Sequence, residues 1–151
     1  MHGPNDFLHH TFSLKMHIAA ISISYIAFGV AFVAAVLYLV QDNAIKNKRT
    51  GIFFSRLPDL SFLDKLIYRS IGLGFPVLAL AILSGVIWTV NIHGVYLWGY
   101  NSRQFYSIVL WLFYAVILHV RLSAKMRGRK VALMCIFAFF IIILSLLGTC
   151  P

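Results

Sequence analysis

The sequence predicts an all-α integral membrane protein, a four-helix bundle, from its composition and from four long apolar stretches. Of 151 residues, 61% are hydrophobic and 11% are charged, whereas soluble globular chains are about a quarter charged. Apolar stretches at about 17–40, 71–90, 105–120 and 131–147 are each long enough to cross a hydrocarbon core of about 30 Å. Because spans in lipid must satisfy their own backbone hydrogen bonds and four short segments cannot close a barrel, each stretch is predicted to be a helix.

The basic residues predict how these spans are oriented. The segments 41–70 and 121–130 hold eleven of the thirteen Lys and Arg residues. Both segments face the same side of the membrane in a four-span chain, and the positive-inside rule makes that side cytoplasmic. We therefore expect a multi-pass protein of the inner (cytoplasmic) membrane, with both termini and the loop 92–104 outside. Topology thus explains the net charge of +9, and nucleic acid is not an expected partner.

The segments around the spans complete the expected organisation. Residues 1–16 are predicted to form an outer N-terminal segment, and 17–151 a single membrane domain. The first span is too long for the apolar region of a signal peptide, so we expect it to remain in the mature protein. In the inner loop, Pro58 precedes apolar residues at helical spacing, which predicts a short amphipathic helix on the inner surface before the second span. Pro76 is expected to kink that span unless neighbouring groups satisfy the freed carbonyl.

The histidines are candidate metal ligands at two levels of the membrane. His17 begins the first span and His93 follows the second, both on the outer side, whereas His119 lies near the inner end of the third. From Gln104 to His119 a helix rises about 22 Å, whereas the two axial nitrogens of one haem iron lie within about 4 Å of each other. Any haem sites would therefore be separate. Histidines that are interfacial, solvated or bonded to a neighbouring carbonyl remain the alternatives.

The outer loop has a composition that suits a flat apolar ligand with acidic groups. Aromatic faces would cover a porphyrin, glycines would allow close approach, and Arg103 could pair with a propionate. An aromatic belt at the membrane interface is the alternative explanation. No CxxCH motif is present, so a haem would be held non-covalently. The cofactor-binding candidates in and near this loop are Trp88, His93, Tyr96, Trp98, Tyr100, Asn101, Arg103 and Gln104.

An ordered set of short motifs resembles the C-terminal half of the cytochrome c assembly family, the CcsA/ResC type of system II haem-handling proteins and the related HemX-type proteins. The resemblance covers about Leu14 to Leu147. The matching stretches are Met16-His17-Ile18, Ser24-Tyr25-Ile26-Ala27-Phe28, Leu63-Asp64, Tyr68-Arg69, Gly74-Phe75-Pro76, Gly85, Trp88, Trp111-Leu112, Tyr114-Ala115, Leu118-His119, Arg121-Leu122 and Arg127-Gly128-Arg129.

The outer loop resembles the family's tryptophan-rich WWD motif, which holds haem on the outer face for attachment to apocytochrome c. Trp98 keeps a tryptophan position and Arg103 keeps a cation. Both carboxylates of the motif are replaced by amides, which form hydrogen bonds without charge. The replacements are Tyr100 and Tyr106 at tryptophan positions, Asn101 at the aspartate position and Gln104 at the glutamate position.

The resemblance also implies which histidines bind iron. His17 matches the outer histidine that ligates the WWD haem, and His119 matches a transmembrane histidine that ligates a second haem nearer the inner side. The second ligand of each site has no match in this chain. A partner membrane subunit or a homo-oligomer would supply the transmembrane one; the alternatives are that His119 binds haem with one protein ligand or that its site is lost. His93, or His9 and His10, would substitute for the outer one.

Together these features predict a haem-binding membrane protein of cytochrome c biogenesis. It would present one or two haem b groups, with membrane lipid, a partner subunit and apocytochrome c as its partners. The alternatives are a b-type cytochrome anchor subunit of a membrane redox complex and a haem-free scaffold or assembly subunit. The sequence offers no activated nucleophile, so we expect at most a component of a haem lyase system and not an enzyme by itself.

Overall fold

The computed structural model describes residues 3–48, 51–52, 54–93, 102–123, 126 and 128–148. Within these residues the fold is entirely helical: α1 (Pro4–Lys46), a short 3-10 turn η1 (Phe54–Arg56), α2 (Leu60–His93), α3 (Ser102–Ser123) and α4 (Arg129–Gly148). Each of the four long helices is apolar and long enough to cross a membrane. The predicted all-α architecture with four spans is therefore confirmed.

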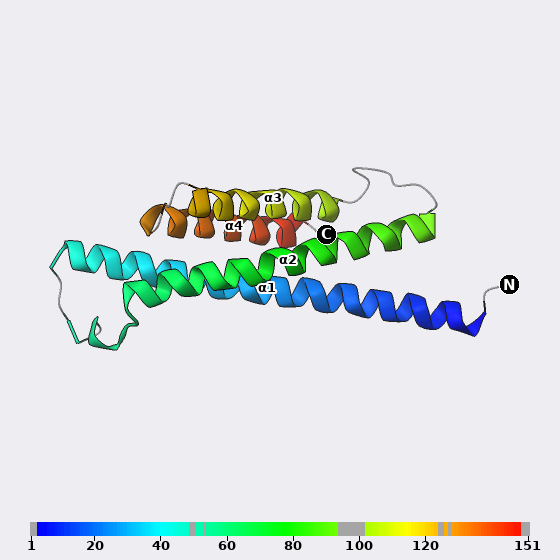
Figure 1. The fold of residues 1–151 in the computed structure, drawn as a ribbon, viewed down its shortest axis with the longest axis horizontal. Coiled ribbons are helices and arrows are strands. Elements are labelled where there is room, and N and C mark those ends of the chain that lie inside the picture. The colour runs from blue at the N-terminus through cyan, green and yellow to red at the C-terminus, as the bar shows by residue number, and fades with distance from the viewer. Residues whose placement is uncertain are drawn as a thin grey trace.

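The first two helices are much longer than a bilayer requires. α1 has 43 residues and α2 has 34, which correspond to about 65 Å and 51 Å, against a hydrocarbon core of about 30 Å. α3 and α4, with 22 and 20 residues, match that thickness. As a result, the N-terminal part of α1 and the C-terminal part of α2 project together beyond α3 and α4 (Figure 1). Residues 4–16 belong to this projection because they continue the helix of the first span.

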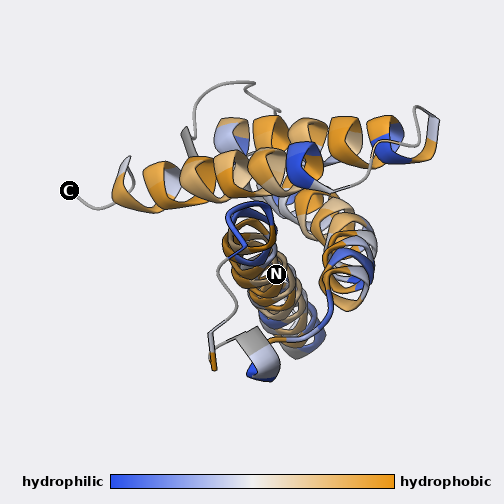
Figure 2. Cartoon of the chain, turned by 90° about the vertical axis from the view of Figure 1, so that its left-hand side faces the viewer, coloured by the Kyte–Doolittle hydropathy of each residue, from blue (hydrophilic) through white to orange (hydrophobic). Residues whose placement is uncertain are grey.

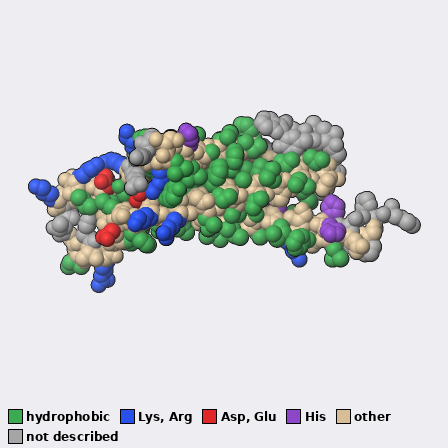
Figure 3. Space-filling view, in the orientation of Figure 1, with side chains coloured by type: hydrophobic (Ala, Val, Ile, Leu, Met, Phe, Trp, Pro, Cys, Tyr) green, Lys and Arg blue, Asp and Glu red, His purple; other side chains and the backbone are tan. Residues whose placement is uncertain are grey.

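The helices form two crossed pairs. Figure 2 shows α1 and α2 nearly end on, whereas α3 and α4 are seen along their lengths. α1 makes its most extensive contact with α2 and also packs on α4, while α3 contacts α2 and α4. Figure 3 shows most of the visible Lys and Arg side chains at the end where α1 finishes, and histidine side chains at the opposite end near the N-terminus. The two ends of the molecule therefore differ in chemistry.

Small residues make up much of the buried face of α1. Ala27, Ala31, Ala34 and Ala35 are buried on one face of α1, and small residues permit the close helix approach on which packing in lipid depends. The larger core groups fill the space between the pairs. Phe28 of α1 stacks on Tyr114 of α3 with ring centroids 3.8 Å apart, and both side chains are fully buried.

The amphipathic segment before the second span is helical but not separate. It forms the first part of α2, which continues without interruption through Pro76. Leu63 and Ile67 are buried in the core of the bundle, so the apolar stripe packs on protein. The expected helix before the second span is therefore present, and it is continuous with that span because its apolar face belongs to the tertiary core.

Candidate functional site

A cavity of about 600 Å³ lies between α1, α2 and α3, toward the end at which α2 finishes. Ligand sites in proteins have volumes of this order, with apolar walls and a few polar groups. Here the apolar walls come mainly from α1 and α2, and α3 contributes polar groups. The lining residues are Leu14, His17, Ile18, Ile21, Leu78, Ala81, Ile82, Gly85, Trp88, Thr89, Gln104 and Ser107. We call this space the outer cavity.

Three predicted site residues meet in the outer cavity. His17 from α1, Trp88 from α2 and Gln104 from α3 all line it, although they are far apart in the sequence. The positions agree with helix periodicity, because Leu14, His17 and Ile21 follow one another at intervals of three and four on one face of α1. Gln104 was expected in the outer loop. It lies instead in the first turn of α3, which begins at Ser102.

The His17 imidazole is held between α1 and α2. Its Nδ1 lies 2.9 Å from the Ser84 hydroxyl of α2, and its Cε1 would lie 2.9 Å from a Cβ built on Gly85. The glycine is thus what lets the ring lie so close to the α2 backbone. Ser84 carries no signal in the sequence that marks it as a site residue, because a single serine in an apolar helix is common.

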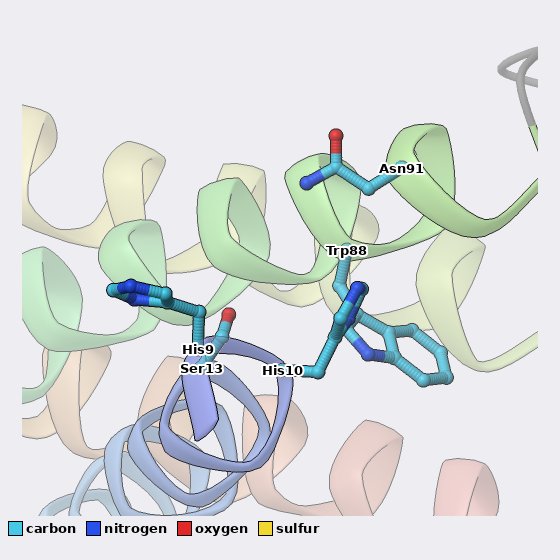
Figure 4. A pocket seen from close by; sticks show the side chains of 5 residues that line it. All are labelled: His9, His10, Ser13, Trp88 and Asn91. Carbon is cyan, nitrogen blue, oxygen red and sulfur yellow. The ribbon is translucent and has the colours of Figure 1, made fainter. Parts of the chain in front are cut away.

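A smaller cavity of about 230 Å³ adjoins the first at Trp88, which lines both. Its other lining residues are His9, His10, Ser13 and Asn91. Figure 4 shows His10 of α1 beside Trp88 of α2, whereas the ring of His9 points away from Trp88. This cavity places the N-terminal histidines in the projecting part of the α1–α2 pair, next to the outer cavity.

His119 lies apart from both cavities. It is exposed on α3, and its Nε2 is 3.5 Å from the Ser123 hydroxyl of the same helix. Because Gln104 lines the outer cavity, His119 is about 22 Å away along α3. Near it, Arg121 pairs with Asp64 of α2 at 2.8 Å and lies over the Tyr68 ring at 4.5 Å. Among the described residues, no group of three or more His, Cys, Asp or Glu side chains could hold a metal ion.

The remaining candidates fall outside what the structure describes. Tyr96, Trp98, Tyr100 and Asn101 lie beyond the described residues. His93 is the last residue of α2, and Arg103 lies in the first turn of α3. The structure describes the backbone of these two residues but not their side chains. Their predicted roles stay predictions.

Comparison with known proteins gives one consistent result. Residues 7–150 match the family profile described as Cytochrome C assembly protein. The cytochrome c biogenesis protein CcsA of Prochlorococcus marinus (strain MIT 9312) is 34% identical across 89% of this chain and 50% of its own length. CcsA of Chlamydomonas reinhardtii is 32% identical across 89% of the chain and 37% of its own length.

A relative with a different name shows the same pattern of coverage. Protein HemX of Bacillus subtilis (strain 168) is 34% identical across 90% of this chain and 50% of its own length. The chain therefore spans about half the length, or less, of these curated relatives. No solved structure matches the chain.

Proposed function

The chain belongs to the cytochrome c assembly protein family, and we propose that it binds haem b non-covalently in the outer cavity, with His17 as the iron ligand. The observation that carries the proposal is the position of His17 at the wall of an apolar cavity of about 600 Å³ that Trp88 and Gln104 also line. Residue type and the family resemblance identify all three side chains as candidates for haem contact.

The donor set of the outer cavity fits such a group. A neutral imidazole nitrogen is a common axial ligand of haem iron. The apolar side chains of α1 and α2 would cover a macrocycle, the Trp88 indole could stack on it, and the Gln104 amide could hydrogen-bond a polar edge. Bound haem supplies redox-active iron and the vinyl groups to which a cytochrome c biogenesis system attaches thiols.

The chain's own residues would bind, orient and shield this group. His17 would fix the position of the iron along α1, and the N-terminal part of α1 would limit access of water from outside. We retain His93, or His9 and His10, as candidates for the second axial position. His9 and His10 both line the adjoining cavity, but only the His10 ring lies beside Trp88 (Figure 4), which supports His10 over His9.

We propose that this site delivers haem to an apocytochrome c. Membrane lipid and a partner membrane subunit would surround the chain. The basic loops would face the cytoplasm and the outer cavity the opposite side, since Lys and Arg residues gather where α1 ends (Figure 3). His119 is exposed on α3, so we propose that a second haem there would need a ligand from a partner or from a second copy of the chain.

The test is a pyridine haemochrome measurement on protein purified in detergent, for wild type, His17→Ala and Met16→Ala. Met16 is the neighbouring exposed residue of α1, so it is a matched control. We expect a b-type haem spectrum in wild type and Met16→Ala, and loss of the outer-site haem in His17→Ala. Wild type without haem, even after reconstitution with hemin, would contradict the proposal and favour a haem-free scaffold.

A second experiment separates delivery from permanent electron transfer. Haem-loaded protein is mixed with an apocytochrome c that carries CxxCH, and haem is followed by its absorption in each protein after separation. Transfer of haem to the apocytochrome, with or without added partner subunits, is expected for biogenesis. Haem that stays bound and is reduced by quinol would favour the anchor subunit of a redox complex.

A further inference from the structure

Two residues of α2 that are not themselves candidate iron ligands lie against the imidazole of His17. Ser84 contacts Nδ1 and Gly85 faces the Cε1 edge of the ring. A Cβ at residue 85 would lie 2.9 Å from Cε1, 3.5 Å from Nε2 and 3.6 Å from Nδ1. The ring is therefore seated edge-on against the helix backbone, with its two nitrogens on either side of the contact.

The hydrogen bonds of Ser84 decide which ring nitrogen carries the proton. The Ser84 Oγ donates to the carbonyl oxygen of Ala81 at 2.9 Å. A serine hydroxyl has one proton. Both contacts of Ser84 are satisfied together only if its proton is directed to Ala81 and the proton shared with His17 comes from Nδ1. In that network Ser84 accepts, and the neutral imidazole is the Nδ1–H tautomer.

This tautomer leaves Nε2 with a lone pair. Within the part of the chain that the structure describes, no hydrogen bond to Nε2 is formed, while His17 lines the outer cavity. Histidines that bind metal through one nitrogen almost always donate the other N–H to a nearby acceptor, which fixes the tautomer and raises the basicity of the ligand. The Ser84 hydroxyl occupies that acceptor position here.

We propose that Ser84 and Gly85 are positioning residues: together they hold His17 as the Nδ1–H tautomer and present Nε2 to the outer cavity. The use of that nitrogen by haem iron rests on the function proposed above. The orientation and tautomer of the His17 ring do not depend on that function, and they can be measured without any ligand.

The first experiment reads the tautomer directly. Protein with ¹⁵N-labelled histidine is placed in detergent micelles at a pH where imidazole is neutral, and ¹H–¹⁵N correlation spectra report which ring nitrogen is protonated. The His17 signal is assigned by its loss in His17→Ala. We expect Nδ1–H in wild type, and a shift toward Nε2–H in Ser84→Ala. Ser84→Thr keeps the hydroxyl and should restore the wild-type tautomer.

The matched control is Ser22→Ala. Ser22 is an exposed serine of α1 whose hydroxyl also donates to a carbonyl of its own helix, that of Ile18, at 2.9 Å. Its removal should leave the His17 spectrum unchanged. An Nε2–H tautomer in wild type, or an unchanged Nδ1–H signal in Ser84→Ala, would overturn the proposal.

The second experiment measures hemin affinity and the midpoint potential of the bound haem. Loss of such a supporting hydrogen bond typically weakens metal affinity about ten- to hundred-fold, and we expect this loss in Ser84→Ala, with recovery in Ser84→Thr. The midpoint potential should rise in Ser84→Ala, because a less basic imidazole stabilises ferric iron less well. Circular dichroism checks that the helices are intact.

The two proposals fail in different ways. If His17→Ala binds hemin like wild type, the proposed haem site is wrong, and the NMR measurement still decides the role of Ser84 in fixing the imidazole. If His17 proves to be the ligand but Ser84→Ala has wild-type affinity and potential, only the positioning role is wrong.

Discussion

The surroundings of His17 and His119 differ, although the sequence selects both as iron ligands. His17 lies between two helices, with its Nδ1 hydrogen-bonded across to α2 and its ring against a glycine. His119 is exposed, and its Nε2 lies 3.5 Å from the Ser123 hydroxyl of its own helix. The His17 ring is thus held across two helices, whereas the contact described for the His119 ring comes from its own helix.

Helix packing explains the difference. The buried residues of α3 are Leu110, Tyr114 and Ile117, at the spacing of one helical face. His119 follows Ile117 by two residues, about 200° around the helix, so it points away from the core. His17 instead lies on the face of α1 that packs on α2, the most extensive contact in the bundle. Of the two candidate ligands, His17 is therefore the one that the packing of α1 on α2 includes.

The largest predicted effect concerns the anchoring of the helix that carries His119. Arg121 and Asp64 form an ion pair in which the side chains are 10% and 17% exposed. Asp64→Ala leaves the Arg121 guanidinium poorly paired, so we expect the free energy of unfolding to fall by about 3 kcal/mol. Thermal unfolding in detergent measures the loss.

Asp42→Ala is the matched control for that change. Asp42 pairs with Lys46 and Arg129, whose side chains are 58% and 50% exposed, so its removal should lower the free energy of unfolding by less than about 1 kcal/mol. Equal losses for the two aspartates would show that burial of the Arg121 pair does not anchor α3.

Gly85→Ala tests whether haem binding in the outer cavity depends on the position of the His17 imidazole. A methyl group at residue 85 would lie 2.9 Å from His17 Cε1, so the imidazole must move away from the α2 backbone. We expect hemin affinity to fall at least about ten-fold, without loss of thermal stability, because alanine favours helix over glycine. Unchanged affinity in a hemin titration would argue against a fixed ring.

Gly74→Ala provides the complementary change eleven residues earlier in α2, about 16 Å along the helix. A Cβ there would lie 2.8 Å from the Phe28 ring, which is fully buried and stacked on Tyr114. Overpacking of that layer, partly offset by helix propensity, should cost about 1 kcal/mol of stability. Hemin affinity per folded molecule should change little. A large loss of affinity with no loss of stability would contradict this separation of the two glycines.

The smallest predicted effect is that of His119→Ala on the outer cavity. His119 is exposed and about 22 Å along α3 from Gln104. Hemin affinity at the outer cavity should therefore change less than about two-fold, since no shared contact links the two positions. A loss comparable with that of His17→Ala would mean that the two regions form one site.

The sequence was sufficient to predict the four spans and part of the site. Hydropathy identified each span, but its ends were underestimated, because α1 and α2 continue as helices past their apolar windows, to Pro4 and to His93. His17, Trp88 and Gln104 were selected from residue type and family resemblance. Ser84 was missed because it is 67 residues from His17 in the chain, and only the packing of α1 on α2 brings the two together.

Chemical rescue can show whether the outer cavity is a preformed haem site whose ligand is His17, as we propose. Hemin spectra of His17→Gly are recorded with and without added imidazole. We expect the mutant to lose the histidine-ligated spectrum and to regain it when imidazole enters the space left by the side chain. A wild-type spectrum in the mutant without imidazole, or no recovery at saturating imidazole, would contradict the proposed site.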